Sequence, residues 1–251
     1  GEMEKNIDSK KKDQIQQIFK DAITKIIPLK EEIVSHQETV EKIRKRLLHS
    51  DIPETFTINF IEPQGSTGLK QTALRKASDI DLFIGLDPSI VLNQNFSSKG
   101  KTRAYIKHII KKNIRDWLIP ELESIGLSNI TLSYAEHPYV SARYNKVELD
   151  IIFCFDLSAD YLQKNGPITA MDRTPHHTRF VLNHLQGSQR NEIRLLKHFF
   201  KCQHCYGDKS AIGRTGFIGY SAELLIIKYG SLYNLFTQFD ELEHKLINCT
   251  P

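Results

Sequence analysis

Two aspartates stand one residue apart in the stretch "SDIDLFIGL" (78–86). If this stretch is a strand, its side chains alternate between two faces, so Asp79 and Asp81 point to one side and Ile80 to the other. Two carboxylates this close raise each other's pKa unless a cation lies between them. Hard oxygen ligands of this kind favour Mg²⁺ or Mn²⁺. The pair therefore indicates a metal site, although an isolated D-x-D is more often an exposed strand end or a turn.

A third carboxylate, Asp150, lies in the stretch "VELDIIFCFDL" (147–157), where a strand would place it on one face with Glu148. Two-metal catalysis needs carboxylates from at least two positions, because one ion serves the attacking hydroxyl and the other serves the triphosphate. We therefore predict that Asp150 is the third metal ligand, on a strand beside the first.

A glycine and a serine, Gly65 and Ser66, precede the strand of the two aspartates. Glycine lets the backbone approach a phosphate closely, and the Ser66 hydroxyl with nearby N–H groups can bind phosphate oxygens. Together with the carboxylates, these are the parts that a polymerase-type nucleotidyl transfer needs. The sequence thus predicts an enzyme that uses two Mg²⁺ ions.

The elements that must position these residues follow from hydrophobic periodicity. Two helices are expected between about residues 8 and 49, with a break near Pro28, and another helix over 102–125. Strands are expected at "TFTINFIEPQG", "NITLSYAE", "YVSARYN" and "VELDIIFCFDL", besides the strand of the aspartates. After Asp156 the pattern is mostly helical. This order predicts an α+β palm domain with a mixed sheet and N-terminal helices over 1–156, and a helical domain over 157–251.

The composition sets broad limits. A chain of 251 residues with 40% apolar residues can bury a large core, and its net charge of +4 permits a polyanionic partner without requiring one. Cations stand among apolar residues at helical spacing in "KIRKRLLH" (42–49) and "KHIIKKNIRDW" (107–117), as solvated helix faces or as nucleic-acid contacts. No apolar run is long enough to cross a membrane, and four cysteines fit a reducing compartment, so we expect a cytoplasmic protein with no membrane contact.

The chain resembles a known family. "GS" followed by "SDIDLF" is similar to the signature of the nucleotidyltransferase superfamily. Further stretches resemble the archaeal-type (class I) CCA-adding tRNA nucleotidyltransferases, in that family's order and close to its spacing. These stretches are "YAEHPYV" (134–140), "VELD" (147–150), "DRTP" (172–175), "NEIRLLK" (191–197), "YG" (206–207) and "GFIGYSAELLI" (216–226).

The resemblance implies roles for individual residues. It makes Asp79, Asp81 and Asp150 the catalytic metal ligands. It assigns nucleotide binding to six residues: Gly65, Ser66, Lys70, His177, Lys197 and Tyr206. Among these, Lys197 and Tyr206 fall on the family's phosphate-binding lysine and tyrosine. His177 falls on the histidine of the family's nucleotide site, and the neighbouring His176 stands where the family has an aromatic residue. Lys197 and His177 on the helical side and the carboxylates on the palm side would then meet one nucleotide from two domains.

The activity that the resemblance implies is the addition of CMP and AMP to tRNA 3′ ends from CTP and ATP. The family continues past the point where this sequence stops, into a C-terminal body and tail. If the chain ends at Pro251, a partner chain or a second copy of the chain would replace that region. Two other functions remain open. One is a superfamily relative that makes 2′-5′ or cyclic oligonucleotides without tRNA, and the other is a non-catalytic nucleotide- or RNA-binding module or one half of a split enzyme.

Overall fold

The computed structural model describes residues 1–77, 79–205 and 215–238. It groups the chain into two compact units. The sheet unit comprises Lys30–Lys70 and Ser78–Phe180, and the helical unit comprises Gly1–Leu29, Gln71–Ala77 and Val181–Pro251. We describe each unit by itself.

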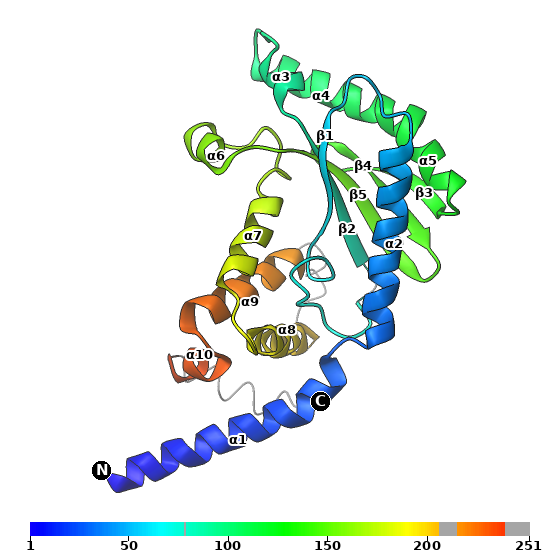
Figure 1. Cartoon of the computed structure of the whole chain (residues 1–251). Coiled ribbons are helices and arrows are strands. Elements are labelled where there is room, and N and C mark those ends of the chain that lie inside the picture. Colours follow the sequence, from blue (N-terminus) through cyan, green and yellow to red (C-terminus); the bar gives the residue numbers. More distant parts are fainter. Residues whose placement is uncertain (78, 206–214, 239–251) are drawn as a thin grey trace. The chain divides into compact units, whose positions relative to one another are not determined.

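The sheet unit contains one mixed five-stranded sheet (Figure 1). Its strands are β1 (Ile58–Gln64), β2 (Asp79–Leu86), β3 (Ser128–Tyr134), β4 (Pro138–Tyr144) and β5 (Val147–Phe155). They lie in the order β1-β2-β5-β4-β3, with β2 and β5 parallel and the other neighbours antiparallel. The predicted α+β class with a mixed sheet is confirmed.

Helices cover this sheet. They are α2 (Lys30–His49), α3 (Ser89–Leu92), α4 (Lys99–Asn113), α5 (Ile119–Ser124) and α6 (Ala159–Asn165), followed by α7 (Thr174–His184), which begins in the sheet unit. Alternation along the strands explains the core, because Leu82 and Leu149 point inward while the aspartates beside them do not. The inward residues pack with α2, α4 and α5 in one apolar cluster that includes Leu47, Ile80, Leu82, Ile84, Ile110, Leu118, Val140, Leu149 and Ile151.

The helix predicted over 102–125 is present as one uninterrupted helical segment, but a π-helical turn, Ile114–Leu118, lies between α4 and α5. Pro120 explains this turn, since proline has no N–H to donate and its ring clashes with the carbonyl four residues earlier. The Ile119 N–H donates to the Ile114 carbonyl instead, which is the longer spacing of a π turn. The sequence analysis overlooked this proline.

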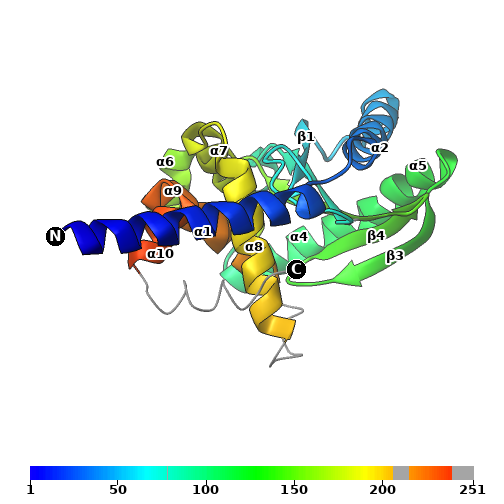
Figure 2. The same ribbon diagram turned by 90° about the horizontal axis from the view of Figure 1, so that it is seen from below.

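The helical unit consists of α1 (Glu2–Ile26), α8 (Gln189–Cys205), α9 (Thr215–Tyr229) and α10 (Leu232–Gln238), together with the C-terminal part of α7 (Figure 2). Its core joins Ile15 and Ile26 of α1 to Leu196 and Phe199 of α8. The first helix therefore makes its contacts with later helices. The predicted division into 1–156 and 157–251 stays a prediction. No helix among the described residues is long and apolar enough to cross a membrane.

Candidate functional site

The structure brings two of the predicted carboxylates side by side. β2 and β5 run parallel, and Asp81 is the register partner of Asp150, while Asp79 faces Glu148. Neighbouring strands lie about 4.8 Å apart. Both aspartates are half-buried on the face opposite to Leu149. A carboxylate pair thus stands at the centre of the sheet, with Asp79 two residues before Asp81 on the same face.

The electrostatics of the pair favour a cation. Burial, with the negative charges of Asp150 and Asp79, raises the pKa of the Asp81 carboxyl to about 6, against an opposing effect of Lys70. A cation bound between the carboxylates would reverse this shift, and carboxylate oxygens are suitable ligands for Mg²⁺. Within the described part of the chain, no group of three His, Cys, Asp or Glu side chains is arranged closely enough to hold a metal ion by itself.

The loop after β1 lies against these carboxylates. Gly65 has a φ of +69°, and a Cβ placed there would stand 3.0 Å from Asp81 Oδ2, so the loop needs glycine at this position. A side chain at Gly68 would collide with the backbone of Pro63. The Thr67 hydroxyl donates a hydrogen bond of 2.6 Å to the Asp79 carbonyl oxygen. The Gly-Ser loop and the aspartate strand therefore form one tight unit.

A serine that the sequence analysis missed holds one of the carboxylates. Ser141 of β4 is the register partner of Asp150 on the neighbouring strand β5, and its hydroxyl donates to Asp150 Oδ1 at 2.8 Å. The Ser133 hydroxyl lies 3.3 Å from that of Ser141. The available signal was the alternation in "YVSARYN", which places Ser141 on the face opposite to Val140. This contact orients Asp150.

Two contacts attach α7 to the ends of the strands. His176 Nε2 lies 2.7 Å from the Leu157 carbonyl oxygen, just after β5. The Thr178 hydroxyl donates to Gln64 Oε1 at 2.6 Å, and both of these residues are fully buried at the end of β1. No periodicity in the sequence marks the Thr178–Gln64 pair. Together these contacts fix α7 on the sheet unit.

His177, the neighbour of His176, lies in a different environment. Burial and the nearby cations Lys70 and Arg173 lower its pKa, so its imidazole is neutral at neutral pH. Lys70 is only 7% exposed and also acts on Asp81. The structure thus places His177, Lys70 and Asp81 within one electrostatic neighbourhood. Their nucleotide-binding roles stay predictions.

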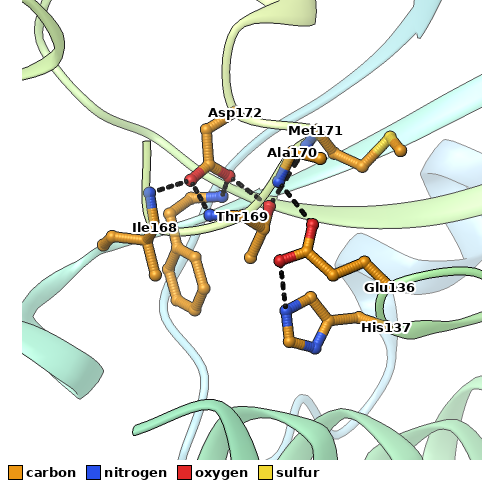
Figure 3. Close-up of polar contacts among 8 residues, drawn as sticks. Glu136, His137, Ile168, Thr169, Ala170, Met171 and Asp172 are labelled. Atoms are coloured by element: carbon orange, nitrogen blue, oxygen red, sulfur yellow. Dashed lines mark hydrogen bonds and ion pairs between the residues drawn. The ribbon is translucent and has the colours of Figure 1, made fainter. Parts of the chain in front are cut away.

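The loop between α6 and α7 is held by one buried carboxylate (Figure 3). Asp172, the first residue of "DRTP", is 1% exposed and accepts four hydrogen bonds, from the N–H groups of Phe155, Ile168 and Thr169 and from the Thr169 hydroxyl. Burial raises its pKa, and these hydrogen bonds oppose the rise. Asp172 is therefore a structural residue that fastens this loop to the end of β5.

A cavity of about 210 Å³ opens beside Asp150. Beside this cavity, the Ala170 N–H donates a hydrogen bond of 3.1 Å to Glu136 Oε2 (Figure 3). His137 also lines the cavity, and its Nε2 is 3.7 Å from Glu136 Oε1. Neither of its buried ring nitrogens makes a hydrogen bond within the described structure. The cavity therefore joins the turn between β3 and β4 to the carboxylate site.

Lys197 and Arg194, both on α8, donate hydrogen bonds to the segment that follows Lys70. Lys197 Nζ donates to the Thr72 carbonyl at 3.1 Å, to the Thr72 hydroxyl at 2.9 Å and to Glu223 Oε1 at 3.3 Å. The Arg194 guanidinium donates to the carbonyls of Gln71 and Ala73 at 2.6 and 2.9 Å. The sequence analysis assigned Lys197 to phosphate and did not single out Arg194 or Glu223. Tyr206, its other predicted phosphate contact, lies outside the described residues.

Comparison with known proteins agrees with the predicted family. Residues 191–249 match the family model described as "tRNA nucleotidyltransferase, second domain". The chain is 33% identical over 230 residues to the CCA-adding enzyme of Saccharolobus islandicus, covering 91% of this chain and 48% of the relative. It is 36% identical over 182 residues to that of Pyrococcus abyssi, covering 71% and 35%. The chain is a homologue of the archaeal CCA-adding enzymes. It spans 48% of the length of the Saccharolobus relative and 35% of the length of the Pyrococcus relative.

Solved structures with similar folds support the same class. The Cid1 poly(U) polymerase aligns with a TM-score of 0.52 at 15% identity, covering 86% of this chain and 55% of that one. CdnC of E. coli MS115-1, in complex with a HORMA protein, aligns with a TM-score of 0.53 at 15% identity, covering 91% and 69%. At this identity the likeness concerns the fold alone. It assigns this CCA-adding enzyme homologue to the polymerase β-like nucleotidyltransferase fold.

Proposed function

We propose that this chain transfers nucleotides to the 3′ end of RNA without a template, adding CMP and AMP to tRNA from CTP and ATP. The observation that carries the proposal is the register pairing of Asp81 with Asp150 beside the Gly65–Ser66 loop. Homology to proteins named CCA-adding enzymes supports the choice of tRNA and of these two nucleotides. Because the chain spans about half of those relatives, the acceptor is part of the proposal.

The reaction would use residues from both strands. Asp81, Asp150 and Asp79 would hold two Mg²⁺ ions, which supply charge for the triphosphate and acidify the attacking hydroxyl. Ser141 keeps the Asp150 carboxylate oriented toward this site. The terminal hydroxyl loses its proton and bonds to the α-phosphorus, and the bond from that phosphorus to the β-phosphate oxygen breaks, so pyrophosphate leaves. Ser66 and the loop N–H groups would bind phosphate oxygens.

Incorporation of radiolabelled CMP and AMP into tRNA that lacks its CCA end tests this function. Asp81→Asn and Asp150→Asn should each lower incorporation by about a hundredfold or more, because each removes a metal ligand. The matched control is Glu148→Gln, which removes a charge from the same face of β5 at an exposed position. It should retain activity. Full activity in either aspartate variant would refute the proposal.

The same preparations separate the two other functions. Incubation with labelled nucleotides and no RNA would give a small oligonucleotide product if the chain makes 2′-5′ or cyclic oligonucleotides. Tight binding of ATP with Mg²⁺ and no turnover on any acceptor would indicate a non-catalytic module. Neither result is expected under the proposed function.

A further inference from the structure

Helix α4 has an unusual charge composition. Its 15 residues, "KGKTRAYIKHIIKKN", include no carboxylate. They include six lysines and arginines: Lys99, Lys101, Arg103, Lys107, Lys111 and Lys112. Ile106, Ile109 and Ile110 are buried in the core of the sheet unit and fix the rotation of the helix about its axis. The positions of the cations on its surface are therefore defined.

Four of these cations form a row. Lys99, Arg103, Lys107 and Lys111 follow each other at intervals of four residues, so they share one flank of the helix at a rise of about 6 Å per step, and the last three lie beside the turn between β3 and β4. Arg103 and Lys107 are exposed and Lys111 is half-buried. We call these three residues the α4 strip. Their spacing is similar to that of successive phosphates in an extended single strand.

The α4 strip runs along the turn between β3 and β4. α4 packs on β4. The positive charges of Arg103 and Lys107 lie near enough to His137 to lower its pKa, which burial lowers further. The carboxylates of Glu136 and Asp172 oppose this effect on His137, and both already accept hydrogen bonds from backbone N–H groups. The strip therefore presents positive charge at the turn with little opposing charge.

An exposed aromatic ring adjoins the α4 strip. Tyr134, the last residue of β3, is 56% exposed. Lys111 Nζ lies 5.7 Å from the centre of its ring. Proteins that bind single-stranded nucleic acid combine cations for the backbone with exposed aromatic rings on which bases stack. Tyr134 and the strip supply both elements next to each other.

The cavity beside this turn extends from His137 to Asp150. His137, near Arg103 and Lys107, lines one part of it, and Asp150 lines another. A strand whose 3′ end lies at Asp150 could therefore pass over the turn and reach the strip. A double helix would not expose a base to Tyr134, because its bases are stacked and paired.

We propose that the α4 strip and Tyr134 bind the single-stranded 3′ segment of the RNA acceptor, the strip through phosphates and Tyr134 through one unpaired base. This inference rests on the proposed function, which supplies an RNA end at Asp150. It adds a surface on the sheet unit that the carboxylates and the Gly-Ser loop do not include.

Fluorescence anisotropy with a 5′-labelled single-stranded RNA that ends in two cytidines tests the surface at several salt concentrations. The test variant combines Arg103→Gln, Lys107→Gln and Lys111→Gln. The matched control combines Lys101→Gln, Lys112→Gln and Arg44→Gln, which removes the same charge from exposed positions on another side of α4 and on α2. The test variant should bind at least about tenfold more weakly, and its log–log salt slope should fall by about 2. The control should keep the wild-type slope.

Tyr134 is tested separately. Tyr134→Ala should weaken RNA binding about fivefold or more without changing the salt slope, because stacking involves no released counterion. Tyr134→Phe keeps the ring and should bind as the wild type does. Equal losses in both triple variants, an unchanged salt slope in the test variant, or wild-type protein that does not bind this RNA would each overturn the inference.

Incorporation assays distinguish this failure from failure of the proposed function. Loss of the α4 strip should raise the KM for RNA and leave the KM for ATP unchanged. Protein that binds RNA through the strip but transfers no nucleotide would refute the proposed function and leave the surface standing. Protein that transfers nucleotides while the triple variant binds RNA normally would refute the surface alone.

Discussion

Lys197 on α8 and Glu223 on α9 form a buried ion pair, with Lys197 Nζ 3.3 Å from Glu223 Oε1. Their side chains are 10% and 1% exposed. The Thr72 hydroxyl completes the group, because it donates to Glu223 Oε1 at 2.7 Å and accepts from Lys197. The Lys197 ammonium also donates to the Thr72 carbonyl oxygen at 3.1 Å. The pair therefore fastens the segment after Lys70 to α8 and α9.

Removing one charge of this pair should destabilise the protein strongly. Glu223→Gln leaves the Lys197 ammonium buried without its counter-charge, so we expect the free energy of unfolding to fall by about 3 kcal/mol or more. Urea unfolding followed by circular dichroism measures this. The double variant Lys197→Met, Glu223→Leu replaces both charges with apolar groups and should recover much of the loss. A double variant no more stable than Glu223→Gln would show that the charges are needed together.

The phosphate role predicted for Lys197 makes a separate prediction. A triphosphate could use this ammonium only if it replaced Thr72 or Glu223 as a partner. If it does, Lys197→Ala should weaken ATP and CTP alike by about 10- to 150-fold, because phosphate carries no base identity. Equilibrium dialysis with each nucleotide measures this, on protein that calorimetry shows to be folded. A loss confined to one nucleotide would place Lys197 at the base.

Much of the fold could be predicted from alternation alone. β2 and β5 alternate between polar and apolar residues over their first four residues. The predicted strands contain β1, β2 and β5, while β3 and β4 each begin one residue before the predicted stretch. The face shared by Asp79 and Asp81 follows from the same period of two. The helix 102–125 was wrong in one respect, since Pro120 introduces a π turn that apolar periodicity does not report.

The supporting contacts of the site could not be predicted in this way. Register between strands is a tertiary property, so the pairing of Asp81 with Asp150 required the structure. Ser141 and Thr178 are polar residues whose partners, Asp150 and Gln64, lie on other strands. A hydroxyl at such a position has no periodicity that separates it from a solvent-exposed one. Contacts of this kind become visible only when the sheet is assembled.

The raised pKa of Asp81 predicts how stability depends on pH without metal. The folded protein holds the Asp81 proton up to a pKa of about 6, above the usual value of 3.8. This contribution to stability is present below about pH 4 and is lost as the pH rises through 6. In EDTA at pH 7, Asp81→Asn should therefore raise the free energy of unfolding, by at most about 3 kcal/mol, and have little effect at pH 4.

At pH 7, Mg²⁺ should make the wild type more stable than Asp81→Asn, which is the reverse of the order expected in EDTA. Wild-type protein should be stabilised by Mg²⁺, and less so below pH 6, because the metal competes with the proton on Asp81. Asp81→Asn should gain little. Thermal unfolding with and without Mg²⁺ measures both effects. If the asparagine variant gains as much stability from Mg²⁺ as the wild type, Asp81 is not a ligand.

The hydrogen bond from Ser141 to Asp150 predicts a positioning role for this serine. Ser141→Ala removes the donor that orients the carboxylate, so the Mg²⁺ concentration needed for half-maximal incorporation should rise about tenfold. The KM for ATP should change little. Ser141 pairs with Asp150 and not with the Gly-Ser loop, so it acts through Asp150 alone. Ser133→Ala is the matched control. The Ser133 hydroxyl lies beside that of Ser141 but does not contact Asp150. Equal effects of the two substitutions on the Mg²⁺ requirement would show that Ser141 acts through general packing of the β3–β4 hairpin and not through the carboxylate.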